Sequence, residues 1–308
     1  MPQKFLSLSP GDIVDVVAPA SSCPQGDLIA GVEELRRWGL HPRVPKNIFS
    51  KRSRFCANSS SYQAKHLIQA INASDSKAIF CVRGGYGSQR LIPYLNKLKK
   101  PQKQKLFVGY SDITWLHHYF NSQWGWRTLH GPFVCELSND SVAASTISHF
   151  KKFIFNTPEV LRFHRLSPMN DKAKKKASVE GRIVGGNLTL IQTTAGTTTP
   201  FKGKGKVVFF EEAGERGYAI DRMLVHMTQA GMFNGIKAMV FGSVTGGLEQ
   251  DGKSYAWQAI RDYAKTASFP VFKGLPCGHG PRNMSLPLNS KVKIIGGKKA
   301  HMQMDLKG

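Results

Sequence analysis

Short apolar runs alternate with segments of helical periodicity along the first half of the chain. Residues 13–17 form a β-branched run that ends in a Ser/Pro loop. In the following segment, residues 27–40, the side chains of Leu28, Val32 and Leu35 recur at the spacing of one helical face. This order predicts a strand, a loop and then a helix.

The same sequence of elements repeats further along. Residues 59–73 again have helical periodicity, and residues 78–82 and 106–109 are apolar runs, each followed by a loop rich in glycine or serine. A repeated strand–loop–helix order predicts parallel βαβ units, whose functional loops lie at the carboxyl ends of the strands. We therefore expect an α/β domain built on a parallel sheet.

A polar, charged segment without apolar periodicity divides the chain at residues 165–181 (RLSPMNDKAKKKASVEG). A chain of 308 residues is longer than one core usually supports, so this segment is the expected linker between two domains. The N-terminal α/β domain would span residues 1–164 and a C-terminal mixed α/β, β-rich domain residues 182–308. The strand-like and helical segments of the second domain are residues 207–210, 220–229, 238–242, 254–265 and 292–295.

Composition narrows the class of protein. No run approaches the roughly 18 apolar residues that cross a membrane, and Asp12 and Asp15 interrupt what would be the apolar core of a signal peptide. The five cysteines are odd in number and never spaced as CxxC, which favours reduced thiols in the cytoplasm. No HExxH or tight His/Cys cluster is present, so neither a metal nor another cofactor is expected.

Charge is the unusual property of this chain, because 43 basic against 20 acidic residues give a formal net charge of +23. The lysines gather in two connecting segments, residues 97–105 and 172–176. No zinc finger, RNA-recognition signature or helix-turn-helix pattern accompanies them, so a solvated basic surface is favoured over a nucleic-acid face. A non-catalytic basic protein that binds nucleic acid is kept as an alternative.

Ser111 is the candidate nucleophile. It follows an apolar run, opens a helical segment and has Gly109 two residues before it, a setting that projects a hydroxyl from the edge of a sheet. The full G-x-S-x-G pattern is absent because Ile113 stands at its last position. The alternative is that Ser111 only caps the helix.

The loop Arg83-Gly84-Gly85-Tyr86-Gly87 fits neither a dinucleotide nor a Walker pattern. A glycine N–H in this loop could contribute to an oxyanion hole, and a tight turn that needs positive φ is the competing interpretation.

His279 lies between two glycines in a loop after a strand-like run, where packing gives a histidine little purpose, so it is the first candidate for a general base. Glu211 and Glu212 end the apolar run 207–210. Because side chains alternate along a strand, only one of these carboxylates can point at the histidine. The other would be a solvated or dimer-facing strand end.

Seven segments, taken in order, resemble the successive motifs of the LD-carboxypeptidases (muramoyltetrapeptide carboxypeptidases). They are VAPASS, RGGYGSQRL, GYSDIT, HGP, GGNL, FFEEAGERGYAIDRML and GLPCGHG. The resemblance extends from about Gly11 to Leu286, and seven ordered motifs are far more specific than any single one. It implies a Ser–His–Glu hydrolase with its active site between the two domains, matching Ser111, His279 and Glu211.

The resemblance also implies an oxyanion hole made by the N–H of Asp112 and by that of Gly84 or Gly85. The implied substrate is a murein tetrapeptide that loses its C-terminal D-alanine during cell-wall recycling, and a homodimer is expected. A related alternative is an immunity peptidase that cleaves a peptide–nucleotide antibiotic. A terminal carboxylate suits a bidentate arginine, for which Arg83 and Arg282 are both candidates.

Two departures from the family pattern affect these expectations. The family commonly has Glu-Asp at the position of Glu211-Glu212, so the motif alone does not choose between the two carboxylates. Residues 57–60 read ANSS where the family has Ala-Gly-x-Asp, a change that concerns the entrance of the site and none of the triad residues.

Overall fold

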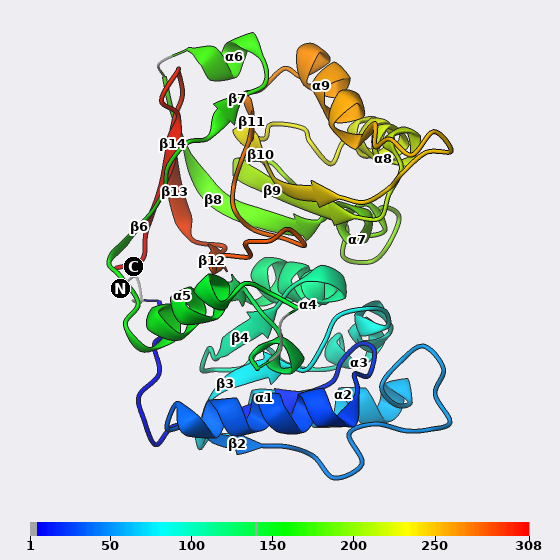
Figure 1. Cartoon of the computed structure of the whole chain (residues 1–308), viewed down its shortest axis with the longest axis vertical. Helices are drawn as coiled ribbons and strands as arrows, with labels where there is room; N and C mark the ends of the chain where they lie inside the picture. The colour runs from blue at the N-terminus through cyan, green and yellow to red at the C-terminus, as the bar shows by residue number, and fades with distance from the viewer. Residues whose placement is uncertain (1–4, 139–140, 176, 308) are drawn as a thin grey trace. The chain divides into compact units, whose positions relative to one another are not determined.

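The computed structural model describes residues 5–138, 141–175 and 177–307, and the chain divides into two compact units (Figure 1). The N-terminal unit comprises Phe5–Thr157 and the short segment Asn283–Pro287. The C-terminal unit comprises Pro158–Arg282 and the chain from Leu288 onward. The first boundary therefore lies between Thr157 and Pro158, before the position expected from the sequence.

The N-terminal unit is built on a six-stranded sheet with the order β12-β5-β4-β3-β1-β2. Its strands are β1 (Ile13–Val17), β2 (His41–Arg43), β3 (Ser76–Cys81), β4 (Leu106–Gly109), β5 (Thr128–His130) and β12 (Leu286–Leu288). Strands β1 to β5 pair in parallel, as between Phe80 of β3 and Val108 of β4. The prediction of a parallel α/β sheet is confirmed.

The helices of this unit follow the predicted alternation with strands. They are α1 (Gln25–Arg37), α2 (Ser60–Asn72), α3 (Ile92–Leu95), α4 (Thr114–Tyr119) and α5 (Ala144–Phe155). Helix α1 buries Leu28, Val32 and Leu35, the three residues that the periodicity placed on one face. Helix α2 begins where the Ser59 hydroxyl accepts a hydrogen bond from the Tyr62 N–H, a normal N-cap.

The C-terminal unit contains an eight-stranded mixed sheet with the order β6-β14-β13-β8-β9-β10-β11-β7. Its strands are β6 (Val160–Phe163), β7 (Ser167–Pro168), β8 (Ser178–Asn187), β9 (Lys206–Ala213), β10 (Ala238–Thr245), β11 (Val271–Lys273), β13 (Lys291–Ile295) and β14 (His301–Asp305). Strands β8 to β11 pair in parallel, while the outer pairs are antiparallel. The expected mixed α/β class is confirmed.

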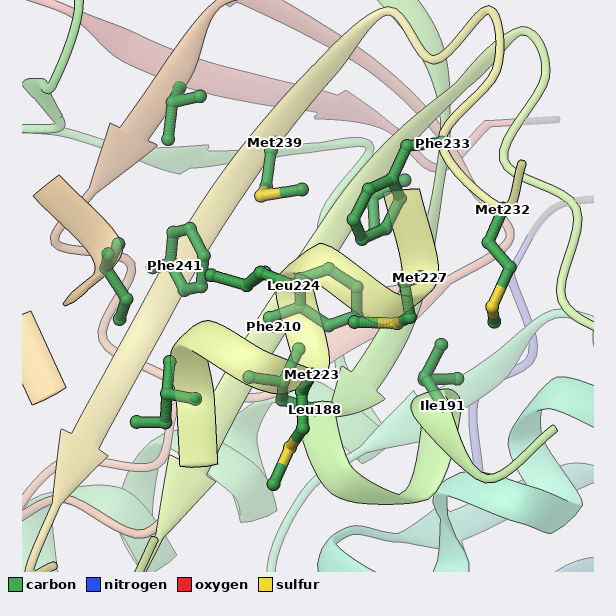
Figure 2. Packing of buried hydrophobic residues seen from close by; sticks show 14 of the residues in the cluster. Leu188, Ile191, Phe210, Met223, Leu224, Met227, Met232, Phe233, Met239 and Phe241 are labelled. Atoms are coloured by element: carbon green, nitrogen blue, oxygen red, sulfur yellow. The ribbon is translucent and has the colours of Figure 1, made fainter. Parts of the chain in front are cut away.

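One face of this sheet is covered by apolar side chains from α7 (Leu188–Gln192), α8 (Gly217–Gln229) and α9 (Ala256–Thr266). Figure 2 shows Leu224 and Met227 of α8 beside Phe210 of β9 and Phe241 of β10. The rings of Phe210 and Phe241 lie 6.1 Å apart. Because Phe210 points into this core, the alternation of the strand sends Glu211 to the opposite face of the sheet.

The expected linker, residues 165–181, is instead part of the C-terminal unit. It contains β7, the short helix α6 (Asp171–Lys174) and the beginning of β8. Asn170 is buried in this segment, and its side chain caps α6 while donating hydrogen bonds to the carbonyls of Ala264 and Phe269. The segment is polar because its side chains make such bonds or face water, whereas its backbone is paired in β7 and β8.

The described residues include no helix with the length and apolarity that a membrane span requires. Across the same residues, His, Cys, Asp and Glu side chains nowhere gather in threes as a metal site would need. The five cysteines are buried, and none of them forms a disulfide bond in the described chain.

Candidate active site

Ser111 occupies a strained turn between β4 and α4. Tyr110 is extended, Ser111 has a φ of 57°, and a 3₁₀ helix then runs from Ser111 to Ile113. The left-handed region costs a non-glycine residue of the order of 1–2 kcal/mol, and such strain is concentrated at functional sites. Gly109 lets the turn pack closely, because a Cβ there would lie 3.0 Å from Ile113 Cγ2. A strand, a sharp turn and a helix together expose the serine hydroxyl.

The glycine loop after β3 lies directly against this serine. A Cβ added to Gly84 would lie 2.9 Å from Ser111 Cβ and 3.1 Å from Ser111 Oγ. Gly85 has a φ of 94° and Gly87 a φ of 127°, so the loop uses backbone conformations that favour glycine. The structure thus brings the glycine loop and the serine turn together at the carboxyl ends of neighbouring strands.

Asp112 connects the serine turn to the glycine loop through its buried side chain. Its Oδ2 accepts a hydrogen bond from the Ser88 N–H at 2.8 Å, and its carbonyl accepts one from the Ser88 hydroxyl at 2.5 Å. Burial raises the pKa of Asp112, while hydrogen bonds from Ser88 and the Gly87 N–H act in the opposite direction. These hydrogen bonds fix the position of the glycine loop relative to the serine turn.

Ser21, after β1, holds the glycine loop from the other side. Its N–H donates to the Gly84 carbonyl at 3.0 Å, and its hydroxyl accepts from the Tyr86 N–H at 3.0 Å. The same hydroxyl donates to the Phe55 carbonyl at 2.6 Å. Loops after three neighbouring parallel strands therefore converge around Ser111.

His117 supports the end of β4 beneath the serine turn. Its Nε2 lies 2.8 Å from the Gly109 carbonyl, and burial lowers its pKa to about 3. The imidazole is therefore neutral at ordinary pH, and Nε2–H donates to the carbonyl.

In the C-terminal unit, Glu211 at the end of β9 contacts His279. The Glu211 side chain is fully buried, and its Oε2 lies 2.6 Å from His279 Nδ1 and 3.3 Å from the His279 N–H. A carboxylate accepts, so Nδ1 carries the proton and the lone pair of the neutral imidazole is on Nε2. This pairing is the arrangement that a histidine base requires.

Glycines around His279 allow its loop to approach β9 and β10 closely. Gly278 has a φ of 110°, and a Cβ there would lie 2.6 Å from Glu211 Cβ and 2.5 Å from Ser243 Oγ. Ser243 of β10 holds the loop, because its hydroxyl accepts from the Gly280 N–H at 2.9 Å and its N–H donates to the Cys277 carbonyl at 2.9 Å. The close approach to Ser243 therefore explains why glycine stands on both sides of His279.

Glu212 points to the other face of β9 and is also buried, so its expected role as a solvated or dimer-facing strand end is wrong. Its side chain accepts hydrogen bonds from Asn187 Nδ2 at 3.1 Å, the Thr189 N–H at 2.9 Å and the Thr189 hydroxyl at 2.8 Å. Burial raises the pKa of Glu212, and the charge of Glu211 raises it further. Glu212 thus fixes the start of α7.

The sequence-predicted residues form two groups, one in each unit. Ser111, Asp112, Gly84, Gly85 and Arg83 lie in the N-terminal unit, and Glu211, His279 and Arg282 lie in the C-terminal unit. Arg83 and Arg282 are both exposed, and the Arg83 guanidinium donates to the Ser22 carbonyl at 3.0 Å.

Ser21, Ser88 and Ser243, which hold the loops that carry the candidate residues, were not predicted from the sequence. Nothing local distinguishes them from surface serines. Ser21 and Ser88 do fall inside segments that resemble family motifs, VAPASS and RGGYGSQRL, and this was the one available signal.

Comparison with known proteins gives a consistent result for both units. A family model of the LD-carboxypeptidase N-terminal domain matches residues 14–131, and one of the LD-carboxypeptidase C-terminal domain matches residues 180–294. Together these models cover more than half of the chain.

Individual relatives align over nearly their whole length. A putative carboxypeptidase of Rickettsia conorii is 34% identical over 94% of this chain and 90% of its own. The murein tetrapeptide carboxypeptidase of Pseudomonas aeruginosa is 27% identical over 92% of this chain and 94% of its own. The microcin C7 self-immunity protein MccF of Escherichia coli is 23% identical over 90% of this chain and 88% of its own.

Solved structures show the same fold. The crystal structure of muramoyltetrapeptide carboxypeptidase from Oxalobacter formigenes superposes with a TM-score of 0.81 and 26% sequence identity, covering 95% of this chain and 98% of that one. With both domain models matched in order and a relative of 34% identity aligned along most of the chain, this protein belongs to the LD-carboxypeptidase family.

Proposed function

We propose that this protein is a serine LD-carboxypeptidase that hydrolyses the bond to the C-terminal D-alanine of a murein tetrapeptide. The observation that carries the proposal is the buried Glu211–His279 hydrogen bond of 2.6 Å, since a carboxylate in this position prepares a histidine for general-base work. The strained turn at Ser111 supplies a candidate nucleophile. The names of the relatives from Pseudomonas aeruginosa and Oxalobacter formigenes support the substrate class.

In the proposed mechanism, His279 Nε2 takes the proton of the Ser111 hydroxyl as Oγ attacks the carbonyl carbon of the scissile peptide bond. Glu211 keeps the proton on Nδ1 and stabilises the imidazolium that forms. The peptide bond then breaks as His279 returns the proton to the amine of D-alanine, leaving an acyl-serine. A water molecule, activated by the same histidine, hydrolyses that ester and regenerates Ser111.

The negative charge that develops on the carbonyl oxygen needs donors that are already in place. The N–H of Asp112 and that of Gly84 or Gly85 are the proposed donors, because the hydrogen bonds through Ser21 and Ser88 hold these segments against Ser111. Preorganised donors of this kind contribute about 10²–10³-fold in kcat.

An exopeptidase also needs a cation for the terminal carboxylate of its substrate. Arg83 suits this role because the Ser22 carbonyl occupies one of its donors and orients the guanidinium beside the glycine loop. Arg282, exposed and three residues after His279, is the other candidate. Comparing Arg83→Lys with Arg282→Lys decides between them, because the variant that loses the carboxylate clamp should show the larger rise in KM for the tetrapeptide.

Release of D-alanine from a purified murein tetrapeptide tests the proposal directly. The wild-type protein should release it, and Ser111→Ala should lower kcat by about four orders of magnitude without unfolding. Ser145→Ala, which removes an exposed serine on α5, is the matched control and should retain full activity. Near-normal turnover by a folded Ser111→Ala protein would remove Ser111 from the mechanism.

The similarity to the microcin C7 self-immunity protein supports a second candidate, an immunity peptidase that cleaves a peptide–nucleotide conjugate. Assaying both substrate classes with one preparation separates the two. Faster cleavage of the conjugate than of the tetrapeptide would reverse the order of preference.

We further propose that the enzyme acts in the cytoplasm as a homodimer. The five buried cysteines without a disulfide suit a reducing compartment. Cell fractionation tests the location, and light scattering of the purified protein tests the oligomeric state. Tight binding to DNA by a protein without peptidase activity would instead favour the nucleic-acid alternative.

A further inference from the structure

Two aromatic side chains of the N-terminal unit contact each other while remaining largely exposed to solvent. Phe55 is 71% exposed and Tyr86 is 52% exposed. Their ring centroids lie 6.4 Å apart with an interplanar angle of 83°, an edge-to-face pair. Phe55 comes from the loop between β2 and α2, and Tyr86 belongs to the glycine loop beside Ser111.

Hydrogen bonds hold the backbone at both residues. The two exposed rings are therefore attached to ordered segments of the chain. The Ser21 hydroxyl accepts from the Tyr86 N–H at 3.0 Å and donates to the Phe55 carbonyl at 2.6 Å. The Ala57 N–H donates to the Ala20 carbonyl at 2.7 Å. A single serine therefore ties the aromatic pair to the loop that touches the candidate nucleophile.

Single exposed aromatic residues are ordinary on protein surfaces. Here the two rings come from different loops, meet at right angles and present two apolar faces at a fixed corner. Such a corner suits a small ring with one apolar face and a short apolar substituent, as in an N-acetylated pyranose.

Positive charge borders the same corner. Lys51, Arg52 and Arg54 precede Phe55 and are exposed, and none of the ion pairs recorded for the described part of the chain involves them. A murein peptide carries free carboxylates, so these cations favour the approach of such a ligand.

We propose that Phe55 and Tyr86 form a subsite for the N-acetylmuramic acid sugar at the amino end of a murein peptide, with the sugar ring stacked on the aromatic pair. This inference rests on the proposed function. The scissile bond precedes the fourth residue of a tetrapeptide, so three residues, about 10 Å when extended, separate it from the sugar. Tyr86 lies two residues beyond Gly84, at most about 7 Å along the backbone, and its side chain extends this reach.

The test compares D-alanine release from two substrates, the free tetrapeptide and the same tetrapeptide linked to N-acetylmuramic acid. Phe55→Ala should lower kcat/KM about tenfold for the sugar-linked substrate and leave that for the free peptide nearly unchanged. Phe55→Tyr keeps a ring and should restore the preference. Ile29→Ala, which removes an exposed apolar side chain from α1, is the matched control and should change neither value.

An equal loss on both substrates would overturn the subsite, because it would place Phe55 in support of the glycine loop rather than in sugar binding. Unchanged kcat/KM on both substrates would overturn it as well. Failure of the proposed function is distinguishable, since the wild-type protein would then release D-alanine from neither substrate.

Discussion

Replacing Gly84 by alanine tests how closely the glycine loop fits against the candidate nucleophile. The new Cβ would lie 2.9 Å from Ser111 Cβ, 3.0 Å from Phe133 Cζ and 3.1 Å from Ser111 Oγ. Gly84 does not have one of the positive φ values found at Gly85 and elsewhere, so alanine can adopt its backbone conformation. The effect of the substitution is therefore steric.

The size of the effect follows from the distances. Carbon atoms pack favourably at about 3.5–4.0 Å, so the neighbours of the new Cβ must move by roughly half an ångström. Close packing holds the ring in place, because Phe133 is buried and stacks on Tyr110 with a centroid separation of 4.4 Å. Overpacking of this kind costs about 1–3 kcal/mol in the free energy of unfolding. A displaced nucleophile should lower kcat by about 10–100-fold.

Thermal unfolding and the kcat for D-alanine release together measure both consequences. Gly26→Ala is the matched control, because a Cβ there meets nothing within 4 Å and lies in the first turn of α1. It should preserve kcat and raise stability by up to about 1 kcal/mol. Wild-type kcat and stability in Gly84→Ala would refute the close fit between the loop and Ser111.

Three further predictions concern the buried carboxylates. Glu211→Gln should lower kcat by about 10³–10⁴-fold because the amide no longer fixes the His279 tautomer, whereas Glu212→Gln should lower kcat far less. Steady-state kinetics of both variants test this. An active Glu211→Gln protein beside a nearly inactive Glu212→Gln protein would reverse the assignment. Burial raises the pKa of Glu212 above its ordinary value of 4.5, so ionisation of this side chain in the folded protein costs stability as pH rises from about 4.5 through the raised pKa. The free energy of unfolding of Glu212→Gln relative to wild type should therefore improve over that interval, and a flat difference in denaturant titrations would contradict this. Asp112→Asn retains one acceptor oxygen for the Ser88 N–H but replaces the other oxygen by an amide donor, so it should lose less stability than Asp112→Ala, which should lose about 1–3 kcal/mol in urea unfolding. Equal stability of the two variants would show that the hydrogen bond from Ser88 contributes nothing.

Features that depend only on neighbouring residues along the chain could be predicted from the sequence. The face of α1 that buries Leu28, Val32 and Leu35 follows from helical spacing alone. The opposite directions of Glu211 and Glu212 follow from the alternation of side chains along a strand. The alternating strands and helices were likewise sufficient to indicate a parallel sheet.

Contacts between distant segments could not be predicted in this way. The hydrogen bonds of Ser21 join loops that lie 34 and 65 residues away in the sequence, and a serine alone gives no sign of such partners. Glu212 was expected to face solvent because a charged strand end usually does, yet donors from Asn187 and Thr189 allow it to be buried. Residues 165–181 resemble a linker in composition, although Asn170 connects them to α9 and β11.

The return of residues Asn283–Pro287 to the N-terminal unit has a consequence for how the protein can be divided. The chain passes from one unit to the other after Thr157, after Arg282 and again after Pro287, so neither unit is a continuous stretch of sequence. A fragment that ends at Thr157 would lack β12, the neighbour of β5, and would lose Asn283, whose side chain lies 3.0 Å from the buried imidazole of His130. After a protease cut near residue 157, the C-terminal fragment would still contribute β12 to the sheet of the N-terminal fragment, beside β5. Separate expression of the two halves is therefore not equivalent to separating two independent modules. His279 lies only four residues before Asn283, where the chain rejoins the N-terminal unit.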